Sequence, residues 1–407
     1  MRVLILGADG YLGWSLALHL SNEGHMVYGL DNFMRRSWVR KMNSETAIPV
    51  GSIQERLQGF FDTFGYLMRF ETISMEDYPQ LCQYISDIKP DAIVHLAECP
   101  SAPYSMHGVH EAAFVMRNNV IGTLYLLHAM RENAPDAHLI KLGTMGEYGT
   151  PDMDIPEGFF EVSANRLDGQ NKMVRLPFPR QAGSWYHWSK VHDSMNVKFA
   201  CDIWGLRSTD IMQGVVYGTQ IDAMKGALGL IDPRLRTRLD FDEAFGTVIN
   251  RFVCQAIVGH PLTVYGDVGK QTRGFLPLRD SMQCLTLAID NPPEEAGEYR
   301  VFNQFENTYS VVELAEKVQS VGNDFDLNVE IGHYEKPRTE VEEHYYNPAH
   351  QHLFDLGYKP SSADMMAELS LMFFDLMEYK DRIKKYKDAL IPKIRWRGEH
   401  EEVDRIR

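Results

Sequence analysis

Near its N-terminus the chain carries the stretch Val3-Leu4-Ile5-Leu6-Gly7-Ala8-Asp9-Gly10-Tyr11-Leu12-Gly13. Its first four apolar residues predict a short buried strand, and the glycines that follow have the spacing G-x-x-G-x-x-G. Leu12, Leu16 and Leu20 recur at every fourth position, which predicts a helix, and residues 26–30 predict a second strand that ends at Asp31. The stretch therefore predicts a strand–helix–strand unit with a tight glycine turn where its helix begins.

The alternation of strands and helices continues to residue 215. Further strands are expected at Ala92–Leu96 and Leu139–Leu142, and helices at Asn118–Arg131 and Val191–Trp204, with an inserted helical excursion over residues 33–66. This order predicts an α/β fold with a doubly wound parallel sheet of the Rossmann type.

The pattern becomes irregular after residue 215, with strands expected at Leu262–Tyr265 and Arg300–Phe302 and helices at Val311–Val321 and Met365–Tyr379. We expect residues 1–215 to form a dinucleotide-binding domain and residues 216–395 a smaller C-terminal α/β substrate domain. Residues 396–407 form a charged tail, and some later elements are expected to return to the first domain.

The glycine turn predicts a site for the pyrophosphate of a dinucleotide, because glycines allow a close backbone approach and a helix N-terminus offers N–H groups. Asp31 ends the second strand, where a carboxylate binds the ribose diol and repels a 2′-phosphate. This favours NAD over NADP. Arg35 and Arg36 leave two readings open, since they could hold a 2′-phosphate or contact adenine and the pyrophosphate.

A second group of residues predicts proton transfer. Tyr186 and Lys190 are four residues apart, so on a helix they share one face. A tyrosine phenol has a pKa near 10 and is a poor base, but a neighbouring ammonium group and a positive nicotinamide ring favour its phenolate. Tyr186 can then remove a proton from a hydroxyl group while hydride leaves the same carbon. Thr144, at the end of an expected strand, can hydrogen-bond the reacting oxygen.

The composition excludes several function classes. The net charge is −15 and the pI is about 5.5, which argues against a nucleic-acid surface. Five scattered cysteines without a C-x-x-C pair argue against a disulfide framework or a zinc site, and we expect no metal. No apolar run approaches the roughly 20 residues that span a bilayer, and the first strand begins at once, so a cytoplasmic protein is expected.

The glycine turn, Thr144 and the Tyr186–Lys190 pair, in this order, resemble the extended short-chain dehydrogenase/reductases that act on nucleotide-activated sugars. The segments 118–123, 213–218 and 262–266 and Arg273 also match that family. Four longer segments resemble one branch of it, the UDP-sulfoquinovose synthases: Ser101-Ala102-Pro103-Tyr104-Ser105-Met106, Thr144-Met145-Gly146-Glu147-Tyr148-Gly149, Lys190-Val191-His192-Asp193-Ser194 and Glu342-Glu343-His344-Tyr345-Tyr346-Asn347. The resemblance covers residues 1–395.

The resemblance implies a reaction and its ligands. NAD would oxidise C4 of UDP-glucose with Tyr186 as base, water would be lost across C5–C6, sulfite would add at C6, and hydride would return to C4. Thr144 would polarise the C4 oxygen, Lys190 would hold the nicotinamide ribose, and Glu147 and His187 would be candidates for the proton transfers at C5 and C6. A tightly held NAD, a homodimer through helices near residues 115–131 and 191–204, and a possible sulfite-donor protein are also expected.

The site residues follow from the same comparison and from the glycine turn. The expected cofactor-binding residues are Gly7, Asp9, Gly10, Tyr11, Leu12, Gly13, Asp31, Asn32, Arg35, Arg36, Leu96, Asn119, Tyr186, Lys190, Gln213 and Val216. The expected substrate-binding residues are Gln213, Arg251, Val264, Tyr265, Gln271, Arg273, Arg338 and His344, of which the three arginines would bind the diphosphate.

Two departures from the family pattern stand out. Pro100 occupies a position where the family has an arginine, so another cation would have to take its place. The acidic residue that the family has near the adenine, after the third strand, is missing, and Glu71 or Thr72 stands there. A UDP-sugar 4,6-dehydratase or 4-epimerase remains the main alternative, although no aspartate follows Thr144 as in the dehydratases. A non-enzymatic NAD-sensing or RNA-binding protein is less consistent with the intact Tyr186 and the acidic charge.

Overall fold

The computed structural model describes residues 1–226, 229–338, 340, 343–361 and 364–398, and its centre is a seven-stranded parallel sheet. In chain order the strands are β1 (Arg2–Leu6), β2 (Met26–Asp31), β3 (Arg69–Thr72), β4 (Ala92–His95), β5 (His138–Thr144), β8 (Arg207–Gln213) and β12 (Tyr299–Gln304). Across the sheet their order is β12-β8-β5-β4-β1-β2-β3, with every neighbouring pair parallel. Because the order reverses between β1 and β4, the predicted doubly wound sheet is confirmed.

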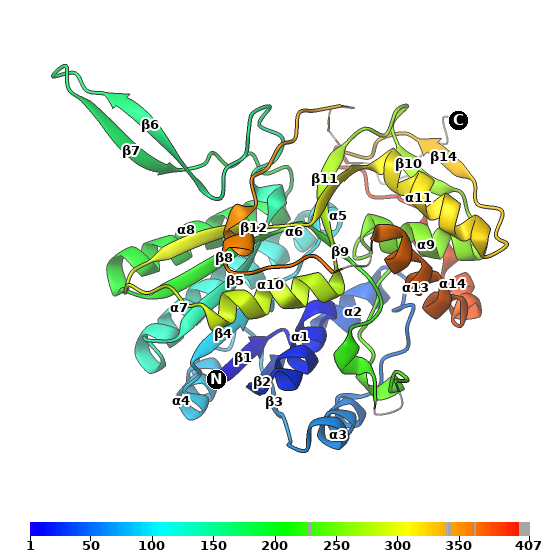
Figure 1. The fold of residues 1–407 in the computed structure, drawn as a ribbon, viewed down its shortest axis with the longest axis horizontal. Helices are drawn as coiled ribbons and strands as arrows, with labels where there is room; N and C mark the ends of the chain where they lie inside the picture. The colour runs from blue at the N-terminus through cyan, green and yellow to red at the C-terminus, as the bar shows by residue number, and fades with distance from the viewer. Residues whose placement is uncertain (227–228, 339, 341–342, 362–363, 399–407) are drawn as a thin grey trace.

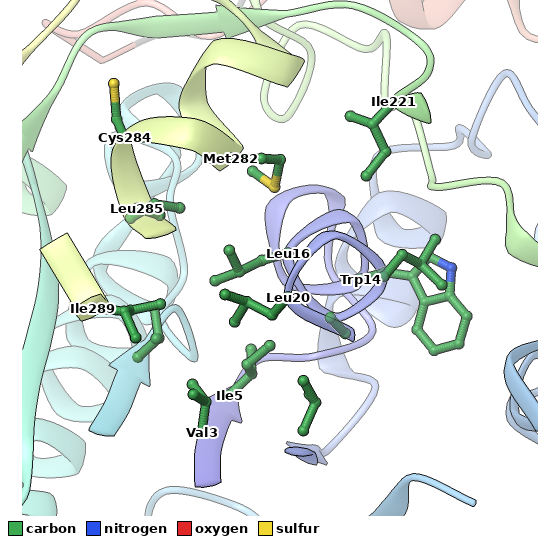
Figure 2. Packing of buried hydrophobic residues seen from close by; sticks show 14 of the residues in the cluster. Val3, Ile5, Trp14, Leu16, Leu20, Ile221, Met282, Cys284, Leu285 and Ile289 are labelled. Carbon is green, nitrogen blue, oxygen red and sulfur yellow. The ribbon is translucent and has the colours of Figure 1, made fainter. Parts of the chain in front are cut away.

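Helices cover both faces of the sheet (Figure 1). Helices α1 (Tyr11–Asn22) and α10 (Leu278–Asp290) pack on one face, and α4 (Tyr78–Ile88), α7 (Gly122–Asn133) and α8 (Trp185–Trp204) pack on the other. Successive side chains of β1 alternate between the two cores, with Val3 and Ile5 in one and Leu4 and Leu6 in the other. Figure 2 shows Val3 and Ile5 in the core that β1 shares with α1 and α10.

The expected excursion after β2 contains α2 (Met34–Lys41) and α3 (Ile53–Phe64). Ser52 caps α3, because its hydroxyl accepts a hydrogen bond from the backbone N–H of Glu55 and the Glu55 carboxylate accepts one from the backbone N–H of Ser52. Phe60 of α3 packs with Trp14 of α1 in the same core. The excursion is therefore folded against the first strand–helix–strand unit.

The helix expected at Asn118–Arg131 is longer than predicted. Helix α6 (Val109–Met116) and α7 are joined by a single π-helical turn, η1 (Arg117–Ile121). Such wide turns are frequent at functional sites. Here the turn contains two adjacent asparagines, of which Asn119 is held by the backbone of Cys99 and by the hydroxyl of Ser189, at 2.9 Å in each case.

The elements after residue 215 lie in two places. Strand β12 is part of the main sheet, and helices α10 and α12 (Gln351–Asp355) pack in the core on one face of it. A separate core is shared by α9 (Val248–Val258), α11 (Val311–Asp324), α13 (Met365–Met377), α14 (Lys380–Lys385), the parallel pair β10 (Leu262–Tyr265) and β14 (Ile331–Tyr334), and the sheet of β9 (Val215–Tyr217), β11 (Thr272–Pro277) and β13 (Asn307–Ser310). Of the expected charged tail, residues 399–407 lie outside the described residues.

One hairpin was not predicted. Strands β6 (Phe159–Asn165) and β7 (Asn171–Pro177) pair antiparallel and extend away from the rest of the molecule (Figure 1). Residues 160–165 alternate between apolar, partly buried and polar, exposed side chains, which is the pattern of a half-buried strand, so the sequence carried a signal for β6 that was overlooked. None of the helices in the described ranges combines the length and the apolar character needed to cross a bilayer.

Candidate active site

A cavity of about 320 Å³ opens at the carboxyl ends of the central strands. Its wall includes residues that follow β1, β2, β4 and β5, where the strand order reverses and where doubly wound sheets bind ligands. Most of the predicted cofactor residues line it: Gly7, Gly10, Tyr11, Leu12, Gly13, Asp31, Asn32, Arg35, Leu96, Tyr186, Lys190, Gln213 and Val216. The predicted residues Asp9, Arg36 and Asn119 do not line it, and Asn118 does.

The glycine loop forms one wall of the cavity. Gly7 has a φ of 87°, in the left-handed region that favours glycine. A Cβ atom on Gly13 would lie 2.1 Å from the carbonyl oxygen of Gly7, so only glycine allows α1 to start this close to the loop. No side chain of the described residues caps α1 at Gly10, which leaves its first N–H groups for an anion. The loop therefore fits a pyrophosphate.

Asp31 lies at the adenosine end expected for a dinucleotide. Its carboxylate accepts hydrogen bonds from the backbone N–H groups of Asp9 at 2.9 Å and Phe33 at 2.7 Å. Burial, and then the charge of Asp9, raise the pKa of Asp31 to about 6. Each carboxylate oxygen retains a lone pair for a ribose hydroxyl. Ile73 and Met75 line the adjoining wall, so this part of the cavity is apolar beyond the third strand.

Carboxylates engage both arginines that follow β2. The Nε and Nη2 atoms of Arg36 each lie 2.7 Å from an oxygen of Asp9. The Nε atom of Arg35 lies 2.7 Å from Asp240, and its guanidinium group stacks 4.2 Å from the centre of the Phe245 ring. Because both arginines are already paired, neither is left as a counter-ion for a 2′-phosphate.

Thr144, Tyr186 and Lys190 line the same cavity. Tyr186 and Lys190 lie one turn apart on α8, and Thr144 ends β5. The Lys190 ammonium donates a hydrogen bond of 2.5 Å to the carbonyl oxygen of Leu142. Burial, and next the negative charge of Glu98, raise the pKa of Tyr186 above its usual range. The phenol is therefore protonated until a further positive charge enters the cavity.

Sequence reasoning missed Glu98, which follows β4 and lines the cavity. Its side chain is 2% exposed, and Oε2 lies 2.8 Å from Nζ of Lys190. A residue just after a parallel strand lies at the ligand-binding edge of the sheet, and this rule could have identified it. The segment before α9 was also missed. It contributes Asp240, Phe245 and Thr247 to the wall, and α9 itself contributes Asn250. That contact depends on the tertiary fold alone.

Pro100 lines the cavity at the position where an arginine was expected. The cations on the same wall are Arg35 and Lys190, and each is paired with a carboxylate, Asp240 for Arg35 and Glu98 for Lys190. Because both are already paired, neither of these wall cations is free to replace the missing arginine.

Glu147 lies behind the wall, since it is fully buried and does not line the cavity. Its carboxylate accepts hydrogen bonds from Lys141 at 3.2 Å and Ser194 at 2.9 Å, and from the backbone N–H of Thr144 at 3.4 Å. A Cβ atom on Gly143 would lie 3.0 Å from this carboxylate, so glycine allows the close packing. In this position Glu147 orients the Thr144 backbone and faces a buried lysine.

His187 projects from α8 toward the loop after β5. Its Nδ1 atom lies 3.0 Å from the hydroxyl of Ser184, and a Cβ atom on Gly146 would lie 2.4 Å from its Nε2 atom. Burial, and then the charges of Arg338 and Arg273, lower the pKa of His187 to about 3. The imidazole is therefore neutral near neutral pH; it does not line the cavity, but unlike Glu147 it is partly exposed.

The predicted substrate residues of β10 and β11 have different surroundings. Arg273 is ion-paired with Glu340, and its Nη1 atom lies 3.2 Å from Nε2 of His344. Gln271 is buried, and its amide donates a hydrogen bond of 3.4 Å to the carbonyl oxygen of Tyr265. Val264 is fully buried in the hydrophobic core, so its side chain is not available to a ligand.

Arg251 and Arg338 are the cations of this region with the fewest partners. The guanidinium group of Arg251 lies 5.9 Å from the centre of the Tyr265 ring, and that of Arg338 lies 5.1 Å from the Trp396 ring. In the part of the chain that the structure describes, neither arginine has a carboxylate within ion-pair distance. Two uncompensated guanidinium groups fit a diphosphate.

Two known proteins are similar in sequence to this chain over nearly its whole length. The model of the NAD dependent epimerase/dehydratase family matches residues 3–172. The UDP-sulfoquinovose synthase of Sulfolobus acidocaldarius is 46% identical over 398 residues, which cover 98% of each chain. The chloroplastic UDP-sulfoquinovose synthase of Spinacia oleracea is 44% identical over 397 residues, 97% of this chain and 79% of that protein.

Solved structures share the fold at much lower identity. UDP-glucose 4-epimerase from Thermotoga maritima, solved with UDP-glucose, has a TM-score of 0.65 and 19% identity over 92% of this chain and 99% of its own. UDP-glucuronic acid 4-epimerase from Bacillus cereus, solved with UDP-glucuronic acid and NAD, has a TM-score of 0.67 and 18% identity over 93% and 99%. At this identity the likeness establishes the fold alone.

Proposed function

The chain belongs to the UDP-sulfoquinovose synthase family, and we propose that it converts UDP-glucose and sulfite into UDP-6-sulfoquinovose with a recycled NAD. The observation that carries the proposal is that Thr144, Tyr186 and Lys190 share one cavity with the glycine loop, as the chemistry requires. NAD held there would supply a hydride acceptor and donor for C4 of the glucose, and its positive ring would favour the Tyr186 phenolate.

The residues of the cavity support NAD as the cofactor. The glycine loop and the uncapped start of α1 suit the pyrophosphate, and Asp31 suits the adenosine ribose diol. Arg35 and Arg36 are committed to Asp240 and Asp9, which removes the cations that a 2′-phosphate would need.

Tyr186 and Thr144 act at C4. Tyr186 takes the proton of the C4 hydroxyl as hydride leaves C4, and the hydroxyl of Thr144 hydrogen-bonds the developing ketone oxygen. Lys190 supplies the positive charge that stabilises the phenolate and binds the ribose next to the reacting ring. The resulting 4-ketone acidifies the proton on C5.

His187 acts at C5 and C6. Its neutral imidazole takes the C5 proton and gives it to the departing C6 hydroxyl, so that water leaves and a C5–C6 double bond forms. The sulfur of bisulfite then bonds to C6, its proton passes through His187 to C5, and hydride and the Tyr186 proton return to C4 and its oxygen. Glu147 holds Thr144 in place from behind the wall instead of exchanging protons with the sugar.

We assign the UDP group to residues 216–395, where Arg251 and Arg338 bind the diphosphate. Arg273 lies close to them but is neutralised by Glu340, so it orients the site more than it adds charge. Two guanidinium groups that have no carboxylate of the described residues at ion-pair distance suit the two charges of a nucleotide-sugar diphosphate.

We also propose a homodimer through α7 and α8. Six large apolar side chains of η1, α7 and α8 are exposed, and four of them lie away from the cavity end of α8: Ile121 (36%), Leu124 (37%), Phe199 (60%) and Ile203 (61%). Sedimentation velocity tests this arrangement. Ile203→Lys is expected to shift the dimer toward monomer, whereas Phe374→Lys, at a 73% exposed residue of α13, leaves it unchanged. Equal behaviour of the two variants would exclude the surface.

Mass spectrometry of the nucleotide sugars tests the reaction. The purified protein is incubated with UDP-glucose and NAD⁺, with and without sulfite, beside the variant Tyr186→Phe. A sulfonated UDP-hexose that forms only with sulfite and is absent in the variant supports the proposal, and shows that a sulfite-donor protein is not required. A dehydrated or epimerised sugar without sulfite would instead assign a 4,6-dehydratase or 4-epimerase activity.

A further inference from the structure

Glu98 is a buried carboxylate of the cavity to which the reaction above gives no role. It lines the cavity and its side chain is 2% exposed. Its Oε2 atom is held by the Lys190 ammonium at 2.8 Å, but among the described residues Oε1 accepts no hydrogen bond. Buried carboxylates seldom lack hydrogen bonds, which points to a donor supplied by a ligand.

The remaining neighbour of Glu98 does not supply that donor. His95 Nε2 lies 3.5 Å from Oε1 and is also 3.1 Å from the hydroxyl of Thr123. Burial lowers the pKa of His95 to about 4, so the ring is neutral near neutral pH and forms no ion pair. The Oε1 atom of Glu98 therefore keeps an acceptor site.

The hydrogen-bond capacity of Lys190 is also limited. An ammonium group has three donors, and those of Lys190 face the carbonyl oxygen of Leu142 and the carboxylate of Glu98 in addition to the cavity. One donor remains for a ligand, but a vicinal diol presents two hydroxyl groups. A carboxylate beside the ammonium can accept a hydrogen bond from the second hydroxyl, as Asp31 is placed to do at the other end of the cavity.

We propose that Glu98 binds the nicotinamide ribose of the cofactor, with its carboxylate accepting a hydrogen bond from one ribose hydroxyl while Lys190 donates one to the other. The inference rests on NAD being the cofactor of the proposed function. Tyr186, Thr144 and Lys190 place the nicotinamide at this end of the cavity, and Asp31 places the adenosine at the opposite end. The cavity thus carries one carboxylate for each ribose.

The experiment compares ADP, ADP-ribose and NADH, which share the adenosine diphosphate but differ in the second ribose. Their dissociation constants are measured by calorimetry on the cofactor-stripped full chain, for the wild type and for Glu98→Gln. The variant is expected to bind ADP normally, and ADP-ribose and NADH about tenfold or more weakly. The matched control Asp31→Asn is expected to weaken all three ligands alike, because each contains the adenosine ribose.

A thermodynamic cycle makes the test direct. An NADH analogue whose nicotinamide ribose lacks one hydroxyl binds the wild type more weakly than NADH does, and the same deletion costs Glu98→Gln less. Equal losses of ADP, ADP-ribose and NADH in Glu98→Gln would overturn the proposal, because they indicate general damage, which thermal unfolding also reports. If Glu98→Gln bound ADP-ribose as the wild type does but had lost turnover, the proposal would also be overturned, and Glu98 would be assigned to proton transfer. None of these binding readouts depends on which sugar nucleotide is the substrate.

Discussion

The guanidinium group of Arg36 holds the carboxylate of Asp9 through two hydrogen bonds of 2.7 Å, and so joins the glycine loop to the excursion after β2. Arg56 of the same excursion binds Asp9 from another side and lies 3.9 Å from the centre of the Trp14 ring. Burial lowers the pKa of Arg56 to about 10, and Asp9 limits this effect. Asp9 therefore serves the architecture of the loop, with its side chain turned from the cavity.

The substitution Asp9→Asn is expected to destabilise the cofactor-free protein by about 3–5 kcal/mol, because it leaves two buried or partly buried guanidinium groups without their counter-ion. Urea unfolding measures the change. The control Asp62→Asn removes an exposed ion pair with Arg234 and is expected to have little effect. Similar losses in the two variants would contradict the role assigned to Asp9.

The preference for NADH over NADPH is expected to depend on pH through Asp31. Because burial raises the pKa of Asp31 to about 6, its carboxylate is charged above this pH and neutral below it. Repulsion of a 2′-phosphate is thus present at about pH 8 and lost as the pH falls through about 6. Fluorescence titrations at both ends of this range give the ratio of dissociation constants.

Asp31→Asn provides the control for that titration. The 2′-phosphate of NADPH also takes up a proton in this range, and this contribution is the same in the variant. The pH dependence attributed to Asp31 is the difference between the two proteins. An identical change of the ratio in the wild type and in Asp31→Asn would show that the carboxylate does not set the preference.

The sequence allowed the prediction of those parts of the site that lie within single elements. The spacing of the glycines fixes the tight turn before α1, and the spacing of Tyr186 and Lys190 places both side chains on one face of a helix. Neither depends on contacts with the rest of the chain. Glu98 follows a predicted strand and could have been identified by that position, whereas Asp240 was missed because it reaches the cavity only through the folding of the segment before α9 over the cofactor end.

Glu147 illustrates a second limit. Its place after Thr144 suggested proton transfer, but a one-residue change of direction after a strand decides whether a side chain faces the cavity or the core. Here the buried Lys141 draws the carboxylate inward. The hairpin of β6 and β7 shows a third, because residues 160–165 do alternate between apolar and polar types, but so short a pattern in an exposed ribbon is easily taken for part of a loop.

Lys141 is expected to be essential for stability. Burial lowers the pKa of this lysine, but Asp210 and Glu147 more than offset the effect and raise it overall. Lys141→Met would leave both buried carboxylates without a cation, at a cost of about 3–5 kcal/mol in urea unfolding at neutral pH. Because the pKa of Lys141 is raised above 10.5, the stability that its charge adds is present at neutral pH and is lost only in strongly alkaline solution, where the deficit is expected to shrink.

A surface lysine makes the comparison specific. Lys198 pairs with Asp202 on an exposed stretch of α8, and Lys198→Met is expected to change the free energy of unfolding little at any pH. If the deficit of Lys141→Met did not depend on pH, the loss would come from packing of the longer side chain instead of from charge.

His187→Asn is expected to separate the two halves of the reaction. Oxidation at C4 needs Tyr186, so UDP-glucose should still convert bound NAD⁺ to NADH, which absorbance detects. The C5 proton should no longer exchange with deuterium from the solvent, and formation of the sulfonated sugar should fall by about 10²–10⁴-fold. Because the pKa of His187 is lowered to about 3, the wild-type rate should show no loss from this group as the pH falls through about 6.5.

Two variants complete this experiment. Tyr186→Phe should lose both NADH formation and deuterium exchange, since it blocks the step that acidifies C5. Glu147→Gln should retain deuterium exchange, at a rate reduced in step with C4 oxidation, because Glu147 acts through the Thr144 backbone. If Glu147→Gln instead abolished exchange while His187→Asn preserved it, the proton transfer at C5 would belong to the carboxylate, and the loop after β5 would have to turn to bring Glu147 into the cavity.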